Sequence, residues 1–354
     1  MLVDCDIHHA SPNKEEWLQY LDEPYRTEFA RNGPRSLLSG IRYEDGGSRW
    51  DASAAKPEHV VEQLLNKYGH RFALLTGNNG SVAGNPDPDY AAAVCKAYND
   101  FTIEKWLPVD DRFVMSMMVP MQDPQLAVRE IERLAGHPRI VSIEFWAAAE
   151  RIPFGSRFYW PIYEAAQRHN LPIHVHPSTI NTIAAPATSA AGNVTNYLQA
   201  HTSLPQFYQA HTISLVLEGV FEVFPGLKIA LIEGGFAWAP HVLWRMDKEY
   251  KGLRQQAPRL RRLPSEYVRD HVRFGTQPIE EPKKVSHLEQ IIDMLGGPEM
   301  LLFCTDFPHW DFDEPSVLPK RLGEGAIRKI LHDNAVEFFN LPKLEEDRAW
   351  AGAR

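Results

Sequence analysis

Acids and histidines gather at four places in the sequence, each at the end of a short apolar run. In chain order these places are Asp4-Cys-Asp6-Ile-His8-His9, His174-Val-His176-Pro177, Ile232-Glu233-Gly-Gly235 and Thr305-Asp306-Phe-Pro-His309-Trp-Asp311. Imidazole nitrogens and carboxylate oxygens are ligands of divalent first-row metal ions. Burying several acids together without a cation is costly. These residue types therefore predict a metal centre, provided that the fold brings the four places together.

Eight apolar runs of strand length alternate with longer amphipathic segments. The predicted strands are Leu2–His8, Phe72–Gly77, Phe113–Pro120, Ile140–Phe145, Leu171–His176, Leu227–Glu233, Val272–Gln277 and Met300–Asp306. The predicted helices are Pro88–Trp106, one opened by Asp123-Pro-Gln, Phe158–Asn170, Leu204–Phe224, Trp238–Leu253, Pro282–Leu295 and Gly325–Phe339. Strands that alternate with helices imply a parallel sheet, and eight repeats favour its closure into a barrel.

We therefore predict an α/β fold with one domain, a (β/α)8 TIM-like barrel over residues 1–343, followed by a charged C-terminal tail over residues 344–354. Long loops are expected after strands one and five, over Ala10–Arg71 and Pro177–Gln206. Loops of this length usually act as lids or interface segments. No GxGxxG follows the first strand, so a dinucleotide-binding fold has no support.

The candidate site follows from the rule that functional residues of such barrels lie at the carboxyl ends of the strands. Side chains alternate along a strand, so Asp4, Asp6 and His8 should share one face, as should His174 and His176. The predicted metal ligands are Asp6, His8, His176, Glu233 and Asp306. The predicted catalytic residues are Asp306, Glu233 and His309, and the candidates for a second metal or for contacts around the first are His9, His174, His211 and Asp311.

Several of these residues also have an ordinary structural interpretation. His174 is as well explained by a packed, hydrogen-bonded core histidine as by a functional one. His9 faces away from His8 unless the chain turns there, and only such a turn would make it a ligand. His309 and Asp311 lie in a loop, where contact with substrate and a structural cap are equally good interpretations.

The composition of the chain argues against nucleic-acid-binding and membrane-spanning proteins. The chain has 354 residues, a formal net charge of -9 and no run of Lys or Arg, so nucleic-acid binding is not expected. No stretch of about 18 apolar residues predicts a membrane span. Three cysteines without a CxxC pair and a chain that begins directly with a strand indicate a cytoplasmic protein. We expect a small-molecule substrate and a homo- or hetero-oligomer.

The chain resembles the amidohydrolase superfamily, in the branch of aminocarboxymuconate-semialdehyde decarboxylase and the resorcylate-type decarboxylases. The resemblance extends from Leu2 to about Leu341. It rests on Asp6-x-His8, on His176 before proline, on Asp306 in Thr-Asp-Phe-Pro-His, and on Gly219-Val-Phe-Glu-Val-Phe-Pro-Gly-Leu-Lys. The branch usually has histidine at the end of strand six, where this chain has Glu233. The resulting carboxylate-rich donor set leans from zinc toward manganese or iron.

This resemblance implies an enzyme in which a metal-bound water drives hydrolysis, or in which a metal-bound carboxylate undergoes non-oxidative decarboxylation, with Asp306 transferring the proton. Glu-Gly-Gly and Asp-x-Pro-His-Trp-Asp are also similar to dinuclear oxygenases such as 2-aminoisobutyrate hydroxylase. That alternative implies a monooxygenase with two ions (Fe/Mn or Fe/Fe), an amino-acid-like substrate and a reductase partner. A third alternative is a non-catalytic partner subunit. One divalent ion per chain (Mn, Fe or Zn) is expected for the first function and two for the second.

Overall fold

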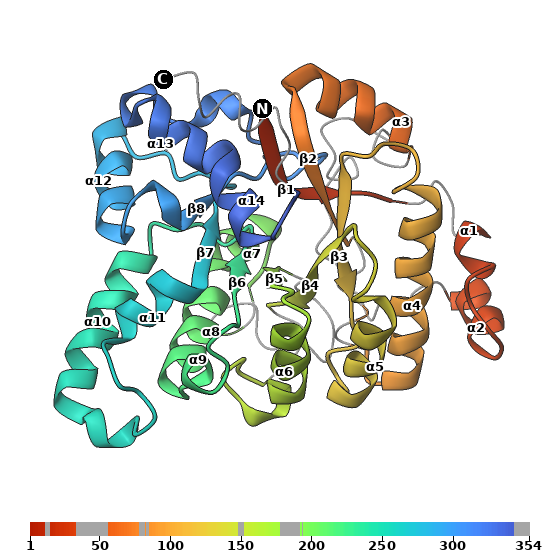
Figure 1. Ribbon diagram of the computed structural model, residues 1–354, viewed down its shortest axis with the longest axis horizontal. Coiled ribbons are helices and arrows are strands. Elements are labelled where there is room, and N and C mark those ends of the chain that lie inside the picture. Colours follow the sequence, from red (N-terminus) through yellow and green to blue (C-terminus); the bar gives the residue numbers. More distant parts are fainter. Residues whose placement is uncertain are drawn as a thin grey trace.

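The eight strands of the computed structural model form one parallel sheet in chain order, from β1 to β8 (Figure 1). The model describes residues 1–10, 15–32, 56–77, 82, 85–147, 152–177, 192 and 194–342. The strands are β1 (Leu2–His8), β2 (His70–Thr76), β3 (Phe113–Met118), β4 (Ile140–Trp146), β5 (Ile173–His176), β6 (Ile229–Leu231), β7 (Val272–Gly275) and β8 (Leu301–Leu302). All eight predicted strands are therefore confirmed.

Backbone hydrogen bonds between β1 and the segment after β8 close the sheet. The amide of Cys5 donates to the carbonyl of Phe303 at 2.9 Å, and the amide of His8 donates to the carbonyl of Phe307 at 2.8 Å. Because the first and last strands meet in this way, the carboxyl ends of all the strands gather at one rim. The predicted (β/α)8 barrel is confirmed.

Helices surround the sheet (Figure 1). They are α1 (Glu15–Leu18), α2 (Tyr25–Asn32), α3 (Pro57–Val60), α4 (Pro88–Lys105), α5 (Pro124–Leu134), α6 (Trp160–Arg168), α7 (Tyr197–Ser203), α8 (Pro205–Leu217), α9 (Val220–Val223), α10 (Ala239–Leu253), α11 (Pro264–His271), α12 (Val285–Leu295), α13 (Glu324–Arg328) and α14 (Asn334–Phe338). Local sequence explains where several begin. Asp123 accepts hydrogen bonds from the amides of Gln125 and Leu126 with Pro124 in the first turn, as its sequence predicts.

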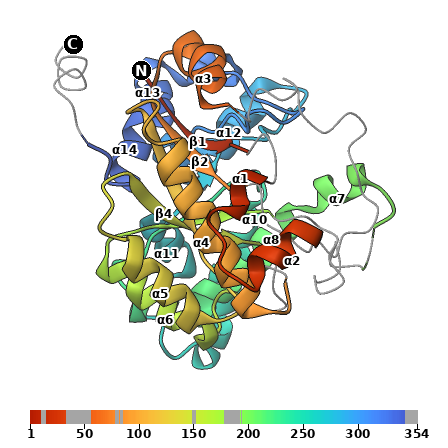
Figure 2. The ribbon, with the colours of Figure 1, turned by 90° about the vertical axis from the view of Figure 1, so that its right-hand side faces the viewer.

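The structure differs from the predicted elements in the connections. The long stretch between β1 and β2 contains α1, α2 and α3, and a π-helical turn over Val61–Asn66 continues α3. A second helix, α11, precedes β7 and was not predicted. The helix predicted over Leu204–Phe224 is divided into α8 and α9, because Gly219 adopts a left-handed conformation with φ of 74°. In Figure 2, α7 stands away from α8 and α10, which lie nearer the middle of the molecule.

The core has two parts. A large apolar cluster lies between the sheet and the helices, and a smaller one lies inside the barrel, where Cys5 and Cys304 pack with Leu74, Ile232 and Phe338. Cys304 is fully buried in this smaller cluster. Toward the carboxyl ends of the strands the buried residues become polar and ionisable, which is where the candidate site lies.

Parts of the predicted organisation fall outside the described residues. These are the C-terminal tail over residues 344–354 and much of the two predicted lid loops, at residues 11–14, 33–55 and 178–191. Among the helices that the structure describes, none combines the length and apolar character that crossing a membrane requires.

Candidate metal centre

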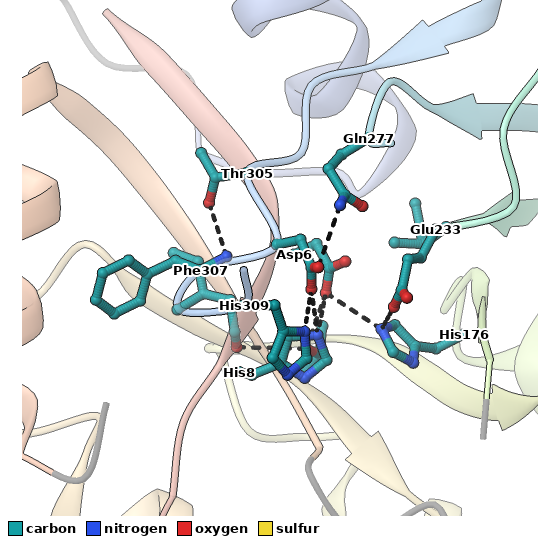
Figure 3. Close-up of polar contacts among 12 residues, drawn as sticks. Asp6, His8, His176, Glu233, Gln277, Thr305, Phe307 and His309 are labelled. Carbon is teal, nitrogen blue, oxygen red and sulfur yellow. Dashed lines mark hydrogen bonds and ion pairs between the residues drawn. The ribbon is translucent and has the colours of Figure 1, made fainter. Parts of the chain in front are cut away.

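Five ionisable side chains converge at the rim of the barrel. Figure 3 labels four of them, Asp6, His8, His176 and Glu233. The five are Asp6 and His8 of β1, His176 at the end of β5, Glu233 after β6 and Asp306 after β8. Each offers one ligand atom, and these five atoms lie within 4.8 Å of one another. All five side chains are buried. They are the five residues that the sequence predicts as ligands, so the structure brings the whole predicted set together.

The short contacts run between histidine nitrogens and carboxylate oxygens. Nε2 of His8 lies 2.9 Å from Oδ1 of Asp306 and 3.5 Å from Oδ1 of Asp6. Nε2 of His176 lies 3.0 Å from Oε2 of Glu233 and 3.7 Å from Oδ1 of Asp6. Asp6 therefore lies between the two histidines, with Asp306 on one side and Glu233 on the other.

Two of the acids reach the cluster through an unusual backbone. Glu233 and Asp306 have φ of 56° and 59°, in the left-handed region that few non-glycine residues adopt. Such strain persists only where the surroundings hold it, and it concentrates at functional sites. Beside Glu233, the chain passes so close to a ring that a Cβ on Gly234 would lie 2.7 Å from Tyr208. Glycine is required there by the close approach.

Asp306 is oriented by two further side chains. Nδ1 of His309 lies 2.7 Å from Oδ1 of Asp306. Nε2 of Gln277, just after β7, donates to Oδ2 of Asp306 at 3.1 Å. The ring of His309 also lies over that of His8, with centroids 4.2 Å apart. His309, predicted as catalytic, thus touches the cluster, and Gln277 is an additional contact.

Burial and mutual repulsion separate the pKa values of the cluster. Burial raises the pKa of Asp306 well above its ordinary value, and the nearby Glu233 and Asp6 raise it further. Burial would also raise the pKa of Asp6, but His8 and His176 bring it below its ordinary value. Burial lowers the pKa of His8 well below its usual range. The protein alone thus favours a protonated Asp306 beside an ionised Asp6.

The donor atoms fit a divalent metal ion. Oδ2 of Asp6 and Nε2 of both His8 and His176 are buried without a partner in hydrogen-bond geometry. Nδ1 of His176 lies 2.7 Å from the carbonyl of Pro177, so it carries the proton and leaves Nε2 as an acceptor. Buried polar atoms are normally satisfied, and a cation at the centre would satisfy these and offset the repulsion between the acids.

His201 joins the site from α7, and the sequence did not single it out. Its Nε2 lies 3.5 Å from Oε1 of Glu233 and 3.4 Å from Oδ2 of Asp311. Asp311, a candidate for a second metal or for contacts around the first, is therefore beside the cluster. The signal for His201 was weak, because it lies in a long connection whose path depends on packing against distant parts of the chain.

His9 was a candidate for a second metal, and the structure turns it away from the cluster. Its Nδ1 lies 3.0 Å from the carbonyl of Thr76, and its Nε2 lies 2.8 Å from the hydroxyl of Thr102 on α4. Burial lowers the pKa of His9 to about 3. The strand continues through His8 without the turn that ligation by His9 would require, so His9 joins the sheet to α4.

His174 and His211 also lie outside the cluster. Nε2 of His174 bonds the carbonyl of Cys5 at 3.0 Å inside the barrel, and burial lowers its pKa to about 4. Nε2 of His211 bonds the carbonyl of Ala147 at 2.7 Å, while its ring stacks on Phe154. Both histidines have lowered pKa values and join backbone segments, and neither offers a ligand atom to the cluster of five. For His174 the structure therefore shows the packed, hydrogen-bonded core interpretation.

Strict alternation along β1 would place Asp4 on the same face as Asp6 and His8. The pairing of β1 with β2 shifts between Asp4 and Ile7, so the alternation is interrupted. The carboxylate of Asp4 consequently bonds Thr305 and His70 rather than joining the cluster. The sequence placed Asp4 wrongly because a register shift has no clear signal in a strand pattern.

Glu144 of β4 is a second residue that the sequence did not identify. It is completely buried, and both of its oxygens lie 3.1 Å from the amide of Gly77. Burial raises the pKa of Glu144 to about 8, against the electrostatic effect of nearby His176. An acid that stays protonated at neutral pH thus lies in the same part of the barrel as the metal centre.

Comparison with known proteins agrees with this geometry. The gamma-resorcylate decarboxylase of Polaromonas sp. (strain JS666) is 25% identical over 295 residues, which cover 79% of this chain and 86% of the relative. The crystal structure of a dihydroxybenzoic acid decarboxylase from Polaromonas sp. JS666, with bound manganese and the inhibitor 2-nitroresorcinol, matches with a TM-score of 0.67 at 20% identity. That match covers 97% of this chain and 98% of the other.

A third match is the 5-carboxyvanillate decarboxylase of Sphingomonas paucimobilis, with a TM-score of 0.71 at 19% identity over 96% of this chain and 99% of that one. At these identities the solved structures show a shared fold. The prediction of an enzyme of the amidohydrolase superfamily is confirmed. The amidohydrolase family model matches residues 3–341, nearly the whole length, and the chain therefore belongs to the amidohydrolase family.

Proposed function

We propose that this protein is a metal-dependent, non-oxidative decarboxylase of small aromatic carboxylates. The proposal rests on the buried cluster in which the acid Asp306 lies together with four other metal donors. These four are Asp6, His8, His176 and Glu233. The names of the relatives support it, because they describe decarboxylases of dihydroxybenzoates and of carboxyvanillate.

Asp6, His8, His176 and Asp306 would hold a divalent metal ion, with Glu233 as a further ligand. Manganese is our first choice because three carboxylates outnumber two imidazoles in the donor set. The manganese in the dihydroxybenzoic acid decarboxylase structure supports this choice. When bound, the ion would hold the substrate carboxylate and withdraw negative charge from the ring.

Asp306 would serve as the general acid. Its proton would go to the ring carbon that bears the carboxylate, after which the carbon–carbon bond breaks, its electron pair returns to the ring and carbon dioxide leaves. Asp306 would then regain a proton from solvent. Gln277 and His309 hold the two oxygens of Asp306, and so would keep the acid aimed at that carbon.

Glu233 stands where the family resemblance implies a histidine, and its negative charge would repel an anionic substrate. When Nε2 of His176 binds the metal, His201 remains to offset that charge, because its Nε2 lies 3.5 Å from Oε1 of Glu233. In the metal-free protein Nε2 of His176 also faces Oε2 of Glu233, at 3.0 Å. Burial would raise the pKa of Glu233, but these histidines hold it well below its ordinary value. We propose that His201 takes over part of the role of the missing strand-six histidine.

The test is turnover of aromatic carboxylates by manganese-loaded protein. Hydroxybenzoates with a hydroxyl beside the carboxylate, beginning with 2,6-dihydroxybenzoate, would be incubated with the enzyme, and the decarboxylated phenol would be measured by chromatography. We expect product that disappears when the ion is removed by a chelator. Absence of product from the whole series, with metal bound, would refute the decarboxylase.

A second candidate is oxygen activation at two metal ions. The observation that favours it is the group formed by Glu233, His201 and Asp311, which adds donors beside the first five. Such an enzyme would need a reductase partner and would bind about two ions, including iron, per chain. Metal counting by mass spectrometry separates the candidates, since one manganese and no oxygen uptake would exclude the oxygenase.

A further inference from the structure

The position of Asp306 is not set by regular sheet structure. β8 ends at Leu302, four residues earlier, and Asp306 itself has φ of 59°. A left-handed conformation at a residue with a Cβ raises the free energy of the folded chain unless neighbouring contacts maintain it. The contacts that maintain it must therefore come from side chains or isolated backbone bonds around Asp306.

Asp4 makes four contacts with one buried carboxylate, and two of them hold Thr305, the residue before Asp306. Its Oδ1 accepts hydrogen bonds from the amides of Thr305 at 3.0 Å and Asp6 at 3.2 Å. Its Oδ2 accepts from the hydroxyl of Thr305 at 2.6 Å and lies 3.3 Å from Nε2 of His70. Asp4 is fully buried, so its two oxygens are satisfied by these protein groups rather than by water. One side chain thus joins β1, β2 and the segment after β8.

Thr305 connects Asp4 to the residues on both sides of Asp306. Its amide and hydroxyl bond Asp4, while its hydroxyl oxygen accepts a hydrogen bond from the amide of Phe307 at 3.2 Å (Figure 3). A hydroxyl can donate once and accept at the same time, so the two bonds are compatible. The residues before and after Asp306 are therefore held by a single hydroxyl that is itself anchored to Asp4.

We infer that Asp4 is a positioning residue that holds Asp306, through Thr305, and Asp6, through its amide, in the geometry that binds the metal and transfers the proton. The inference rests on the proposed function, because it assigns Asp4 a role toward that same centre. Asp4 is not one of the five clustered donors, so its role would be exerted through its neighbours. Residues that orient ligands in this way typically change metal affinity or activity about 10- to 100-fold when replaced.

The experiment compares Thr305→Val and Asp4→Asn with wild type. Valine is nearly isosteric with threonine but can neither donate to Asp4 nor accept from Phe307. Thr305→Ser keeps the hydroxyl and serves as the rescue. Ser142→Ala on β4 is the matched control, since it removes a fully buried barrel hydroxyl whose Oγ has no hydrogen-bond partner.

Three quantities are measured: the Mn²⁺ dissociation constant by calorimetry, the melting temperature in chelator, and kcat and KM for decarboxylation. We expect Thr305→Val and Asp4→Asn to weaken Mn²⁺ binding about 10- to 100-fold and to lower kcat with little change in KM. Thr305→Ser and Ser142→Ala should resemble wild type in all three quantities, because both variants keep the hydroxyl bonds between Asp4, Thr305 and Phe307.

Wild-type Mn²⁺ affinity in both Thr305→Val and Asp4→Asn would overturn the inference. So would Mn²⁺ binding by Thr305→Ser that is as weak as that of Thr305→Val, because the retained hydroxyl would then not be what positions the ligands. Wild-type protein that binds Mn²⁺ but decarboxylates nothing would refute the proposed function alone, and the affinity comparison would still decide the role of Asp4.

Discussion

His309 and Asp306 face each other across one turn of chain, with Nδ1 of the histidine 2.7 Å from Oδ1 of the acid. The same oxygen lies 2.9 Å from Nε2 of His8, at the other end of the sequence. One carboxylate oxygen therefore meets two imidazoles, while the second oxygen accepts from Gln277. The acid that we propose as proton donor is therefore contacted at both of its carboxylate oxygens.

Replacing Asp306 with asparagine keeps the shape of the side chain but removes its transferable proton. We expect kcat for decarboxylation to fall roughly 10²- to 10⁴-fold, the usual contribution of a general acid. Circular dichroism should remain that of wild type. Asp111→Asn, at a completely exposed aspartate, is the control and should leave kcat unchanged. A fully active Asp306→Asn enzyme would show that another group supplies the proton.

The neighbours His8 and His9 should behave differently toward metal. A ligand present at 100 times its dissociation constant stabilises a protein by about 2.7 kcal/mol, which is readily seen as a rise in melting temperature. We expect this rise with Mn²⁺ in His9→Gln but not in His8→Gln, because only His8 faces the cluster. His9→Gln should melt earlier than wild type in chelator, since it loses its bonds to Thr76 and Thr102. Equal Mn²⁺ responses in the two variants would contradict the assignment.

Glu144 should make the metal-free protein less stable as pH rises. Its pKa is about 8 in the folded state against 4.5 as the reference value. Between these values the unfolded chain has lost the proton and the folded chain retains it, so raising the pH favours unfolding by up to about 1.4 kcal/mol per pH unit. This contribution is complete below pH 4.5 and lost by pH 8.

Glu144→Gln should remove that slope, and Glu164→Gln, at an exposed glutamate on α6, should retain it. Urea denaturation at several pH values between 5 and 8, in chelator, measures the difference. The free energy of unfolding of Glu144→Gln relative to wild type should increase steadily with pH. A constant difference across this range would mean that Glu144 does not hold its proton in the folded protein.

Gly234→Ala should be less stable than wild type. A Cβ there would lie 2.7 Å from the ring of Tyr208, whose hydroxyl donates to the carbonyl of Ile232. Forcing an extra methyl group into a packed site costs about 1–3 kcal/mol, and here it would also displace Glu233. Gly136→Ala, where a Cβ meets nothing within 4 Å, is the control. Denaturation curves that show equal stability for the two variants would refute the steric argument.

The sequence by itself was sufficient for the barrel and for the five clustered residues. Eight apolar runs separated by helical segments specify a parallel sheet, and a closed parallel sheet brings all carboxyl ends of its strands to one rim. Polar residues at the ends of strands one, five, six and eight must then be near one another, whatever the details of packing. That is why Asp6, His176 and Asp306 could be paired across 300 residues of sequence.

Only the tertiary structure decided which of the remaining polar residues reach the centre. His201 arrives on α7, whose position depends on packing that no local pattern records. A register shift in β1 turns Asp4 toward Thr305, and left-handed backbone at Glu233 and Asp306 aims these acids inward. Local periodicity determines which residues belong to a strand end, whereas the direction of each side chain depends on long-range contacts that the periodicity does not contain.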